Sequence, residues 1–273
     1  MNISFIGAGN VATHLARALA VSGCKILSVH TRSEASARHF AAEHHCQIAL
    51  QVEDIPLSDI YIFSIKDDNL PEVVATFGKT HPSAGLCLHT AGSMPMEIFS
   101  GHVQQYGVIY PLQTFSKKRQ LDYQKIPFFI EANTDENLER IRLLANSISG
   151  SVYPLNSEQR KMLHLAAVFA CNFSNHCFAI AASLLEKSEL PAKLLVPLIT
   201  ETCSKLNDMS PVEGQTGPAV RYDQKVMEKQ VGLLGDDTVR KNIYLIMSQS
   251  IHEYSQKFLE NQMNNQTNKE IND

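Results

Sequence analysis

The feature that most constrains the fold is a glycine motif at residues 7–12, which fits the pattern G-x-G-x-x-A. It directly follows an apolar, β-rich run (residues 3–6) and opens a stretch with helical spacing of apolar residues. In such a strand–turn–helix unit, Gly7 permits the tight turn, Gly9 lets the backbone approach a pyrophosphate, and Ala12 keeps the helix close to the sheet. The motif predicts a dinucleotide-binding domain; the alternative is a glycine-rich turn in an unrelated α/β fold.

The end of the second predicted strand indicates which dinucleotide binds. An NAD site usually has Asp or Glu there, about 20 residues beyond the glycines, to bind the ribose 2′-hydroxyl. This chain instead reads Thr31-Arg32-Ser33, with no acid. Arg32 offers a planar guanidinium for a 2′-phosphate, and the hydroxyls of Thr31 and Ser33 can donate hydrogen bonds. The pattern favours NADP as the cofactor, with NAD possible if Arg32 is only a surface residue.

The order of elements predicts an α/β domain followed by an all-α domain. In the first half, short β-rich runs alternate with helical stretches, as in a Rossmann-type, mostly parallel sheet. The predicted strands are 3–6, 26–30, 60–65, 86–89, 108–110, 128–131 and 152–155. Helix-start patterns, including a capping box, begin at Asn69 and Thr134. We expect a dinucleotide-binding domain over 1–155, a helical substrate or dimerisation domain over 156–262, and a disordered tail over 263–273.

Composition excludes several classes of protein. The 273 residues include 24 Lys and Arg against 28 Asp and Glu, which gives a formal net charge of −4. A mildly acidic chain lacks the clustered positive charge that binding to nucleic acid or to an anionic membrane requires. The longest basic run, residues 117–119, is interpreted as a solvated loop.

The six cysteines show no metal-binding spacing and indicate a reduced protein. The most apolar helix, residues 165–185, is interrupted by Asn172, Asn175 and His176, and the first strand leaves no room for a signal peptide. We therefore expect a soluble, cytoplasmic protein.

Ligands of an open α/β sheet lie beyond the carboxyl ends of its strands, and polar residues follow three strands here. The backbone of Ser64, Ile65 and Lys66 is expected to border the cofactor. The turn His89-Thr90-Ala91-Gly92-Ser93 offers an imidazole and hydroxyls to a polar substrate beside the nicotinamide, or else it caps a helix. Residues 110–115 end a third strand and are expected to shape a pocket wall.

The long helix predicted after residue 156 carries a second group of candidates. Lys161, His164 and Asn172 are spaced at helical intervals and so share one face. Lys161 or His164 can protonate a developing alkoxide or amine, and Asn172 can orient the substrate. The alternative is that His164 is a structural histidine, although polar groups on an apolar helix are costly to bury unless they are paired. The candidate catalytic residues are His164, Asn172, Ser93 and Lys161.

A loop between two predicted helices, residues 216–223, contains Arg221 and Asp223. Arg221 can clamp a substrate carboxylate with Asp223 as its orienting partner, or the two residues form a local salt bridge. The expected substrate-binding residues are thus His89, Thr90, Arg221 and Asp223. The expected cofactor-binding residues are Gly7, Gly9, Asn10, Val11, Ala12, Thr31, Arg32, Ser33, Ser64, Ile65 and Lys66. No metal site is expected.

On these residues the chain resembles a group of uncharacterised Rossmann-type proteins assigned as NADP oxidoreductases, with a helical C-terminal domain of unknown function. The matching pieces are residues 7–12, 89–93, 107–115, 164–175 and 216–223, which together extend over nearly the whole chain. More distantly, the chain is similar to pyrroline-5-carboxylate reductases and β-hydroxyacid dehydrogenases, whose long helix after the Rossmann domain carries active-site groups. The resemblance implies two domains and NADP, and it implies no substrate.

Three positions depart from the patterns of these families. The uncharacterised group has His where this chain has Tyr110, and Gly where it has Tyr222. The Lys-x-x-x-Asn pair of the β-hydroxyacid dehydrogenases is absent, since Leu165 stands four residues after Lys161. The mechanism of that family is therefore not expected here.

The residues and the resemblance together predict an NADP-dependent oxidoreductase that passes hydride between the nicotinamide and a small carbonyl, imine or hydroxyl substrate. A pyrroline-5-carboxylate-type imine reductase is one alternative. A non-catalytic NADP-binding sensor or scaffold is the other, because the sequence shows no sharp acid/base constellation. Apolar residues on more than one side of the long helix predict a homodimer formed through the helical domain.

Overall fold

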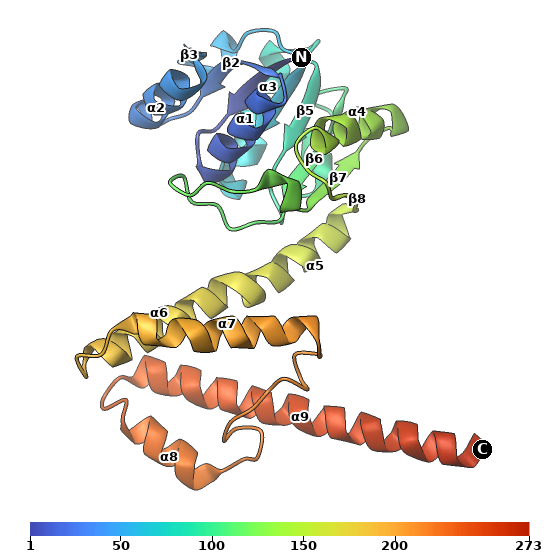
Figure 1. Ribbon diagram of the computed structural model, residues 1–273. Coiled ribbons are helices and arrows are strands. Elements are labelled where there is room, and N and C mark those ends of the chain that lie inside the picture. Colours follow the sequence, from blue (N-terminus) through green and yellow to red (C-terminus); the bar gives the residue numbers. More distant parts are fainter. Residues whose placement is uncertain (273) are drawn as a thin grey trace. The chain divides into compact units, whose positions relative to one another are not determined.

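The computed structural model describes residues 1–272 of the chain (Figure 1). It divides into two compact units, Met1–Phe178 and the residues from Ala179 onward, and each is described by itself. The division falls later than the boundary predicted after residue 155. The reason is that the start of the long helix is bound to the sheet unit through the ion pair of Arg160 with Glu131.

The first unit is built on one eight-stranded sheet with the order β3-β2-β1-β4-β5-β6-β7-β8. The strands are β1 (Asn2–Ile6), β2 (Lys25–His30), β3 (Gln47–Ala49), β4 (Ile60–Phe63), β5 (Leu86–His89), β6 (Tyr106–Pro111), β7 (Phe128–Ala132) and β8 (Val152–Pro154). All neighbouring strands pair in parallel except β6 and β7. The predicted Rossmann-type, mostly parallel sheet is confirmed. Its strand order reverses between β1 and β4, the point at which such sheets bind ligands.

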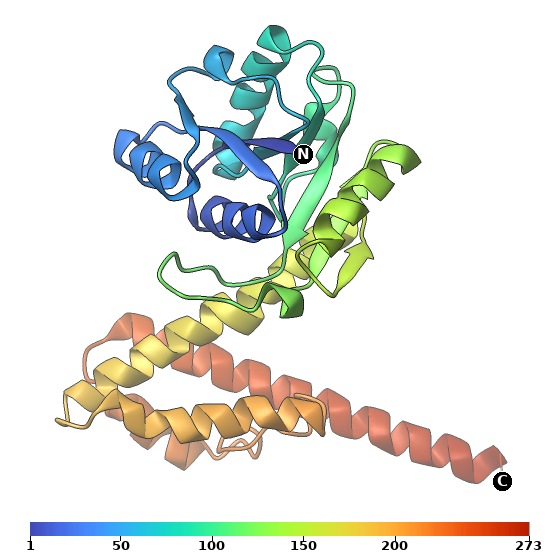
Figure 2. The ribbon, with the colours of Figure 1, turned by 45° about the horizontal axis from the view of Figure 1, so that its top comes forward.

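Helices cover both faces of the sheet (Figures 1 and 2): α1 (Asn10–Val21), α2 (Glu34–His44), α3 (Leu70–Thr80) and α4 (Asp135–Asn146). Successive strand residues point to opposite faces, so Phe5 and Ile6 of β1 lie in different cores. The core of Phe5 includes Leu15 of α1 and Ile141 of α4, whereas the core of Ile6 includes Val74 of α3. Thus α1 and α4 pack on one face and α3 packs on the other.

Both predicted helix starts are correct in position, but only one of the two N-cap side chains makes the capping hydrogen bond. Thr134 is the N-cap of α4, and its side chain accepts a hydrogen bond from the amide of Asn137, as predicted. Asn69 occupies the N-cap position of α3 but makes no capping bond, so the predicted capping box is wrong. Its backbone is already in the right-handed helical region, whereas a capping side chain reaches the amides from an extended backbone.

A continuous helical run consists of α5 (Ser157–Ala167), a π-helical segment (Val168–Phe173) and α6 (Ser174–Glu186). The π-helical turn is wider than an α-helical turn, so it rotates the residues that follow and interrupts the face predicted from three- and four-residue steps. Among the described residues, this run alone has the length and apolar composition of a membrane-spanning helix. Its most apolar window is not buried in the described structure.

The second unit contains α7 (Val196–Ser204), α8 (Gln224–Gly232) and α9 (Thr238–Asn272), and no strand is present in its described residues. Tyr222, where the resembling family has glycine, has φ +53°, in the left-handed region that favours glycine. The described α9 extends to Asn272, across most of the tail predicted as disordered over 263–273. These residues extend a helix that is already formed, so they avoid the unfavourable nucleation step that an isolated polar tail would need to become helical. Asp273 lies outside the described residues.

Candidate functional site

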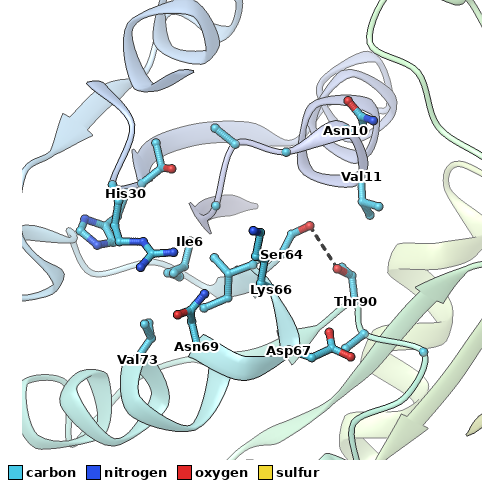
Figure 3. A pocket seen from close by; sticks show the side chains of 18 of the residues that line it. Ile6, Asn10, Val11, His30, Ser64, Lys66, Asp67, Asn69, Val73 and Thr90 are labelled. Carbon is cyan, nitrogen blue, oxygen red and sulfur yellow. Dashed lines mark hydrogen bonds between the residues drawn. The ribbon is translucent and has the colours of Figure 1, made fainter. Parts of the chain in front are cut away.

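A cavity of about 750 Å³ lies at the carboxyl ends of β1, β2, β4 and β5 (Figure 3). Its wall combines the glycine motif, the residues that follow β2, β4 and β5, Tyr110 of β6 and His164 of α5. The cavity therefore coincides with the point where the strand order reverses, where the topology predicts a ligand.

The glycine motif has the geometry of a pyrophosphate-binding loop. Gly7 has φ +111°, and its amide donates to the carbonyl of His30 at 2.7 Å. A Cβ on Gly7 would overlap the carbonyl oxygen of Ser64, so only glycine fits there. At Gly9 a Cβ would meet no atom within 4 Å, which leaves this backbone open to a ligand. Gly9 is also the N-cap of α1 and provides no side-chain cap, so the first amides are free to bind an anion. Ala12 is fully buried and does not line the cavity, which fits its predicted role in keeping α1 close to the sheet but not a direct cofactor contact.

At the end of β2, Thr31 and Arg32 line the cavity beside His30. Arg32 is exposed and takes part in none of the ion pairs of the described residues. Its guanidinium is therefore available to a 2′-phosphate. Ser33 does not line the cavity, because its side chain caps α2 by accepting a hydrogen bond from the amide of Ser36 at 3.3 Å.

The predicted residues after β4 also belong to the cavity. Ser64, Ile65 and Lys66 all line it, as do Asn10 and Val11 of the glycine motif. Figure 3 shows the hydrogen bond that joins the ends of β4 and β5, in which the Thr90 hydroxyl donates to that of Ser64 at 3.1 Å.

A Tyr–His pair is the strongest acid/base feature of the cavity. The hydroxyl of Tyr110 and Nδ1 of His164 are 3.0 Å apart, and both residues line the cavity. Burial raises the pKa of Tyr110 above its ordinary value, against an opposing effect of Arg160, so the hydroxyl stays protonated at neutral pH. A Cβ on Gly92 would stand 2.6 Å from the imidazole, so glycine is needed for the ring to lie here. The sequence predicts Tyr110 only as part of a pocket wall, because no local pattern links Tyr110 to a residue as distant in the chain as His164.

Arg160 fixes α5 to the turn after β5. Its side chain is 1% exposed, is ion-paired with Glu131 of β7, and donates to the carbonyl oxygens of Ala91 and Met94. His164 lies one helical turn beyond Arg160, so this network positions the imidazole. No motif in the sequence singled out Arg160, whose role depends on partners in β7 and in the turn after β5.

His89 does not face the cavity, and its predicted role in substrate binding is wrong. The residue is completely buried, with its ring stacked 5.8 Å from that of Phe99. Burial, with a further effect of Arg160, lowers the pKa of His89 to about 3, so its imidazole is neutral. Strand alternation explains the error, since His89 and Thr90 point to opposite sides and Thr90 lines the cavity instead.

Three further catalytic candidates do not line the cavity. Ser93 donates to the carboxylate of Asp67, and Lys161 donates to Glu158 at 2.7 Å. Asn172 is exposed within the π-helical segment, which removes it from the helical face predicted from regular spacing. Of the four residues predicted to be catalytic, the structure brings only His164 to the cavity.

Arg221 and Asp223 belong to the second unit. Asp223 is the N-cap of α8 and accepts a hydrogen bond from the amide of Val226 at 3.3 Å. The ion pairs of the described chain do not include one between Arg221 and Asp223, so the alternative of a local salt bridge is wrong. Their role toward a substrate stays a prediction.

Comparisons with known proteins cover both halves of the chain. Residues 2–86 match the family described as "NADP oxidoreductase coenzyme F420-dependent". Residues 126–251 match a family described as a domain of unknown function, DUF2520. No curated protein matches the chain.

Solved structures include a protein of Bacteroides fragilis assigned as an NADP oxidoreductase. It is 45% identical, with a TM-score of 0.89, over 92% of this chain and 98% of that chain. A pyrroline-5-carboxylate reductase from Streptococcus pyogenes is 16% identical, with a TM-score of 0.62, over 93% of this chain and 98% of that chain. An imine reductase from Myxococcus stipitatus in complex with NADP⁺ is 16% identical, with a TM-score of 0.63, over 94% of this chain and 95% of that chain.

These findings confirm the predicted family, its cofactor NADP, and a Rossmann-type sheet domain followed by a helical part. The two more distant structures share the fold. The high identity and near-complete coverage of the Bacteroides fragilis protein decide the family. The chain belongs to this family of NADP oxidoreductases, in which a Rossmann-type domain precedes a helical domain of unknown function.

Proposed function

We propose that the protein transfers hydride between the nicotinamide of NADP and a small carbonyl, imine or hydroxyl compound. The observation that carries this proposal is that the dinucleotide motif and the Tyr110–His164 pair line one cavity. NADP supplies the hydride chemistry when it is bound. The protein must hold the cofactor and manage one proton, and the cavity has residues suited to each task.

The cofactor-binding part of the wall is formed by contiguous motifs. The free amides that follow Gly9 would hold the pyrophosphate, and the guanidinium of Arg32 with the hydroxyl of Thr31 would hold the 2′-phosphate. The backbone from Ser64 to Lys66 would border the cofactor. The nicotinamide would then extend toward Gly92 and His164.

His164 is the proton donor of the proposed reaction, and Tyr110 positions it. Reduction of a C=O or C=N bond adds hydride to carbon and a proton to the heteroatom. The Tyr110 hydroxyl can donate to Nδ1 of neutral His164 and can accept from Nδ1–H of the charged ring. The bond therefore persists in both protonation states, and Nε2 is left to reach the substrate.

An imine of the pyrroline-5-carboxylate type is a second candidate substrate class, because pyrroline-5-carboxylate and imine reductases share this fold. The rival from another class is a protein that binds NADP as a sensor or scaffold without turnover. A sensor or scaffold would bind NADP as an enzyme does, so a measurement of NADP binding alone does not distinguish the two functions.

The distinguishing experiment supplies NADPH and a panel of aldehydes, oxo acids and cyclic imines, and follows the absorbance of the reduced nicotinamide. We expect reduction of at least one compound. His164→Ala should then lower turnover by about 10²-fold while NADPH affinity is retained. Tight NADPH binding with no reduction of any compound would support the sensor or scaffold instead.

We also propose a homodimer formed largely through the helical domain. Phe169, Phe173 and Phe178 are 62%, 51% and 41% exposed in the described chain, and apolar surface of this kind is usually covered by a partner. An interface of roughly 2,000 Å² is expected. Light scattering at micromolar concentration should give twice the mass of the chain, and a monomeric mass would contradict this proposal.

A further inference from the structure

The connection between β6 and β7 brings the basic run Lys117–Arg119 to the glycine motif. Nζ of Lys117 donates to the carbonyl oxygen of Ala8 at 2.8 Å, although the two residues are 109 positions apart. Ala8 directly precedes Gly9, the N-cap of α1. The run was predicted to be a solvated loop, yet the ammonium of its first residue lies beside the loop that would hold the pyrophosphate.

Three contacts with α1 fix this connection in place. Asn10 and Arg17 donate to the carbonyl oxygens of Phe115 and Lys117, each at 2.9 Å. The ring of His14 bonds the carbonyl of the residue between them, also at 2.9 Å. Figures 1 and 2 both show the connection running along α1. The backbone of Lys117 is therefore held in position by the protein itself, which reduces the entropy that ordering its side chain costs on binding.

The charge of Lys117 is not balanced locally. None of the ion pairs of the described residues includes it. By contrast, two cationic side chains, Arg32 and Lys66, and two anionic ones, Asp67 and Glu72, line the cavity, so their formal charges cancel. A cofactor with a pyrophosphate and a 2′-phosphate thus meets no net positive charge from the lining alone. Lys117 does not line the cavity, but its ammonium lies beside the glycine motif.

We propose that Lys117 is a cofactor-binding residue whose charge acts on the pyrophosphate from behind the glycine motif. The amides of α1 bond the anion, and the ammonium held on the Ala8 carbonyl raises the positive potential where the anion lies. For opposite unit charges about 6 Å apart, with an effective dielectric constant of about 40, the contribution is roughly a factor of ten in affinity. This inference rests on the NADP site and is independent of the hydride transfer proposed above.

Calorimetric titration of NADPH into matched variants of the full chain tests the role of the charge. Lys117→Gln keeps a donor for the Ala8 carbonyl and removes the charge, so it should weaken NADPH binding by about tenfold. Lys117→Arg keeps the charge and should stay within about threefold of the wild type. Lys118→Gln makes the same charge change at an exposed neighbour and should stay within about twofold, because solvent screens it. Unchanged NADPH affinity in Lys117→Gln would overturn the proposal.

A second ligand distinguishes the loss of the Lys117 charge from a change in the shape of the cofactor site. Adenosine 2′-monophosphate has the 2′-phosphate and lacks the pyrophosphate. Its affinity should therefore be the same in the wild type and in Lys117→Gln. An equal loss of affinity for both probes would mean that the substitution deforms the whole site, and this too would overturn the proposal. Both titrations are made without substrate, so an absence of turnover does not affect their outcome.

Discussion

Replacing Gly92 by alanine tests whether the cavity depends on the position of the His164 ring. The new Cβ would stand 2.6 Å from Cγ and Nδ1 of His164 and 2.9 Å from its Cβ. Gly92 is not in the left-handed region, so alanine adds no backbone strain there. Helix α5 cannot retreat, because Arg160 is buried and ion-paired with Glu131 one turn earlier. The imidazole must therefore rotate and give up its hydrogen bond to Tyr110.

The cost of Gly92→Ala follows from these contacts. Overpacking costs about 1–3 kcal/mol and the lost hydrogen bond about 1 kcal/mol, a total of about 2–4 kcal/mol. For a unit of this size, the melting temperature in scanning calorimetry should fall by roughly 5–15 °C. In a His164→Ala background only the contact with Cβ remains, so Gly92→Ala should cost less than half as much there. An equal cost in both backgrounds would show that the His164 ring does not pack against Gly92.

Three other predictions concern single residues. Arg32→Ala should remove most of the preference for NADPH over NADH in calorimetric titrations, and equal affinities in the wild type would contradict a role in binding the 2′-phosphate. Glu131→Gln leaves a buried guanidinium without its partner and should lower the free energy of unfolding in urea by about 3–5 kcal/mol, whereas Glu139→Gln, in an exposed ion pair, should change it by less than about 1 kcal/mol. The pKa of His89 falls from 6.5 to about 3 on folding, so the unfolded state binds the extra proton between these values. Stability should therefore decrease below pH 6.5 by up to about 1.4 kcal/mol per pH unit, and urea titrations of His89→Gln should lack this component.

Most of the fold could be predicted because its signals are local. The apolar runs at 26–30 and 86–89 are bounded by turn residues and correspond to β2 and β5. Strand β3 has only three residues, too few to show a period. The reversed direction of β7 depends on its pairing with β6 across the connection that carries Lys117, and no short pattern in the sequence encodes that pairing.

The cofactor half of the site could be predicted and the catalytic half only in part. Gly7 and Arg32 stand in contiguous motifs whose chemistry can be recognised without knowing the fold. Tyr110 and His164 meet only because β6 and α5 pack together, and the sequence shows each residue without its partner. The π-helical segment likewise has no clear sequence signal, and it removes Asn172 from the face on which regular spacing placed it.

In the proposed function, nicotinamide chemistry takes place beside the Tyr110–His164 pair. A crystal structure of the protein with bound NADPH would show whether the nicotinamide lies there. We predict that the pyrophosphate lies on the amides that follow Gly9. The reactive nicotinamide carbon should lie within about 7 Å of His164 Nε2, with room for one substrate group in contact with both. A nicotinamide ring directed away from Gly92 and His164 would contradict the proposed role of His164.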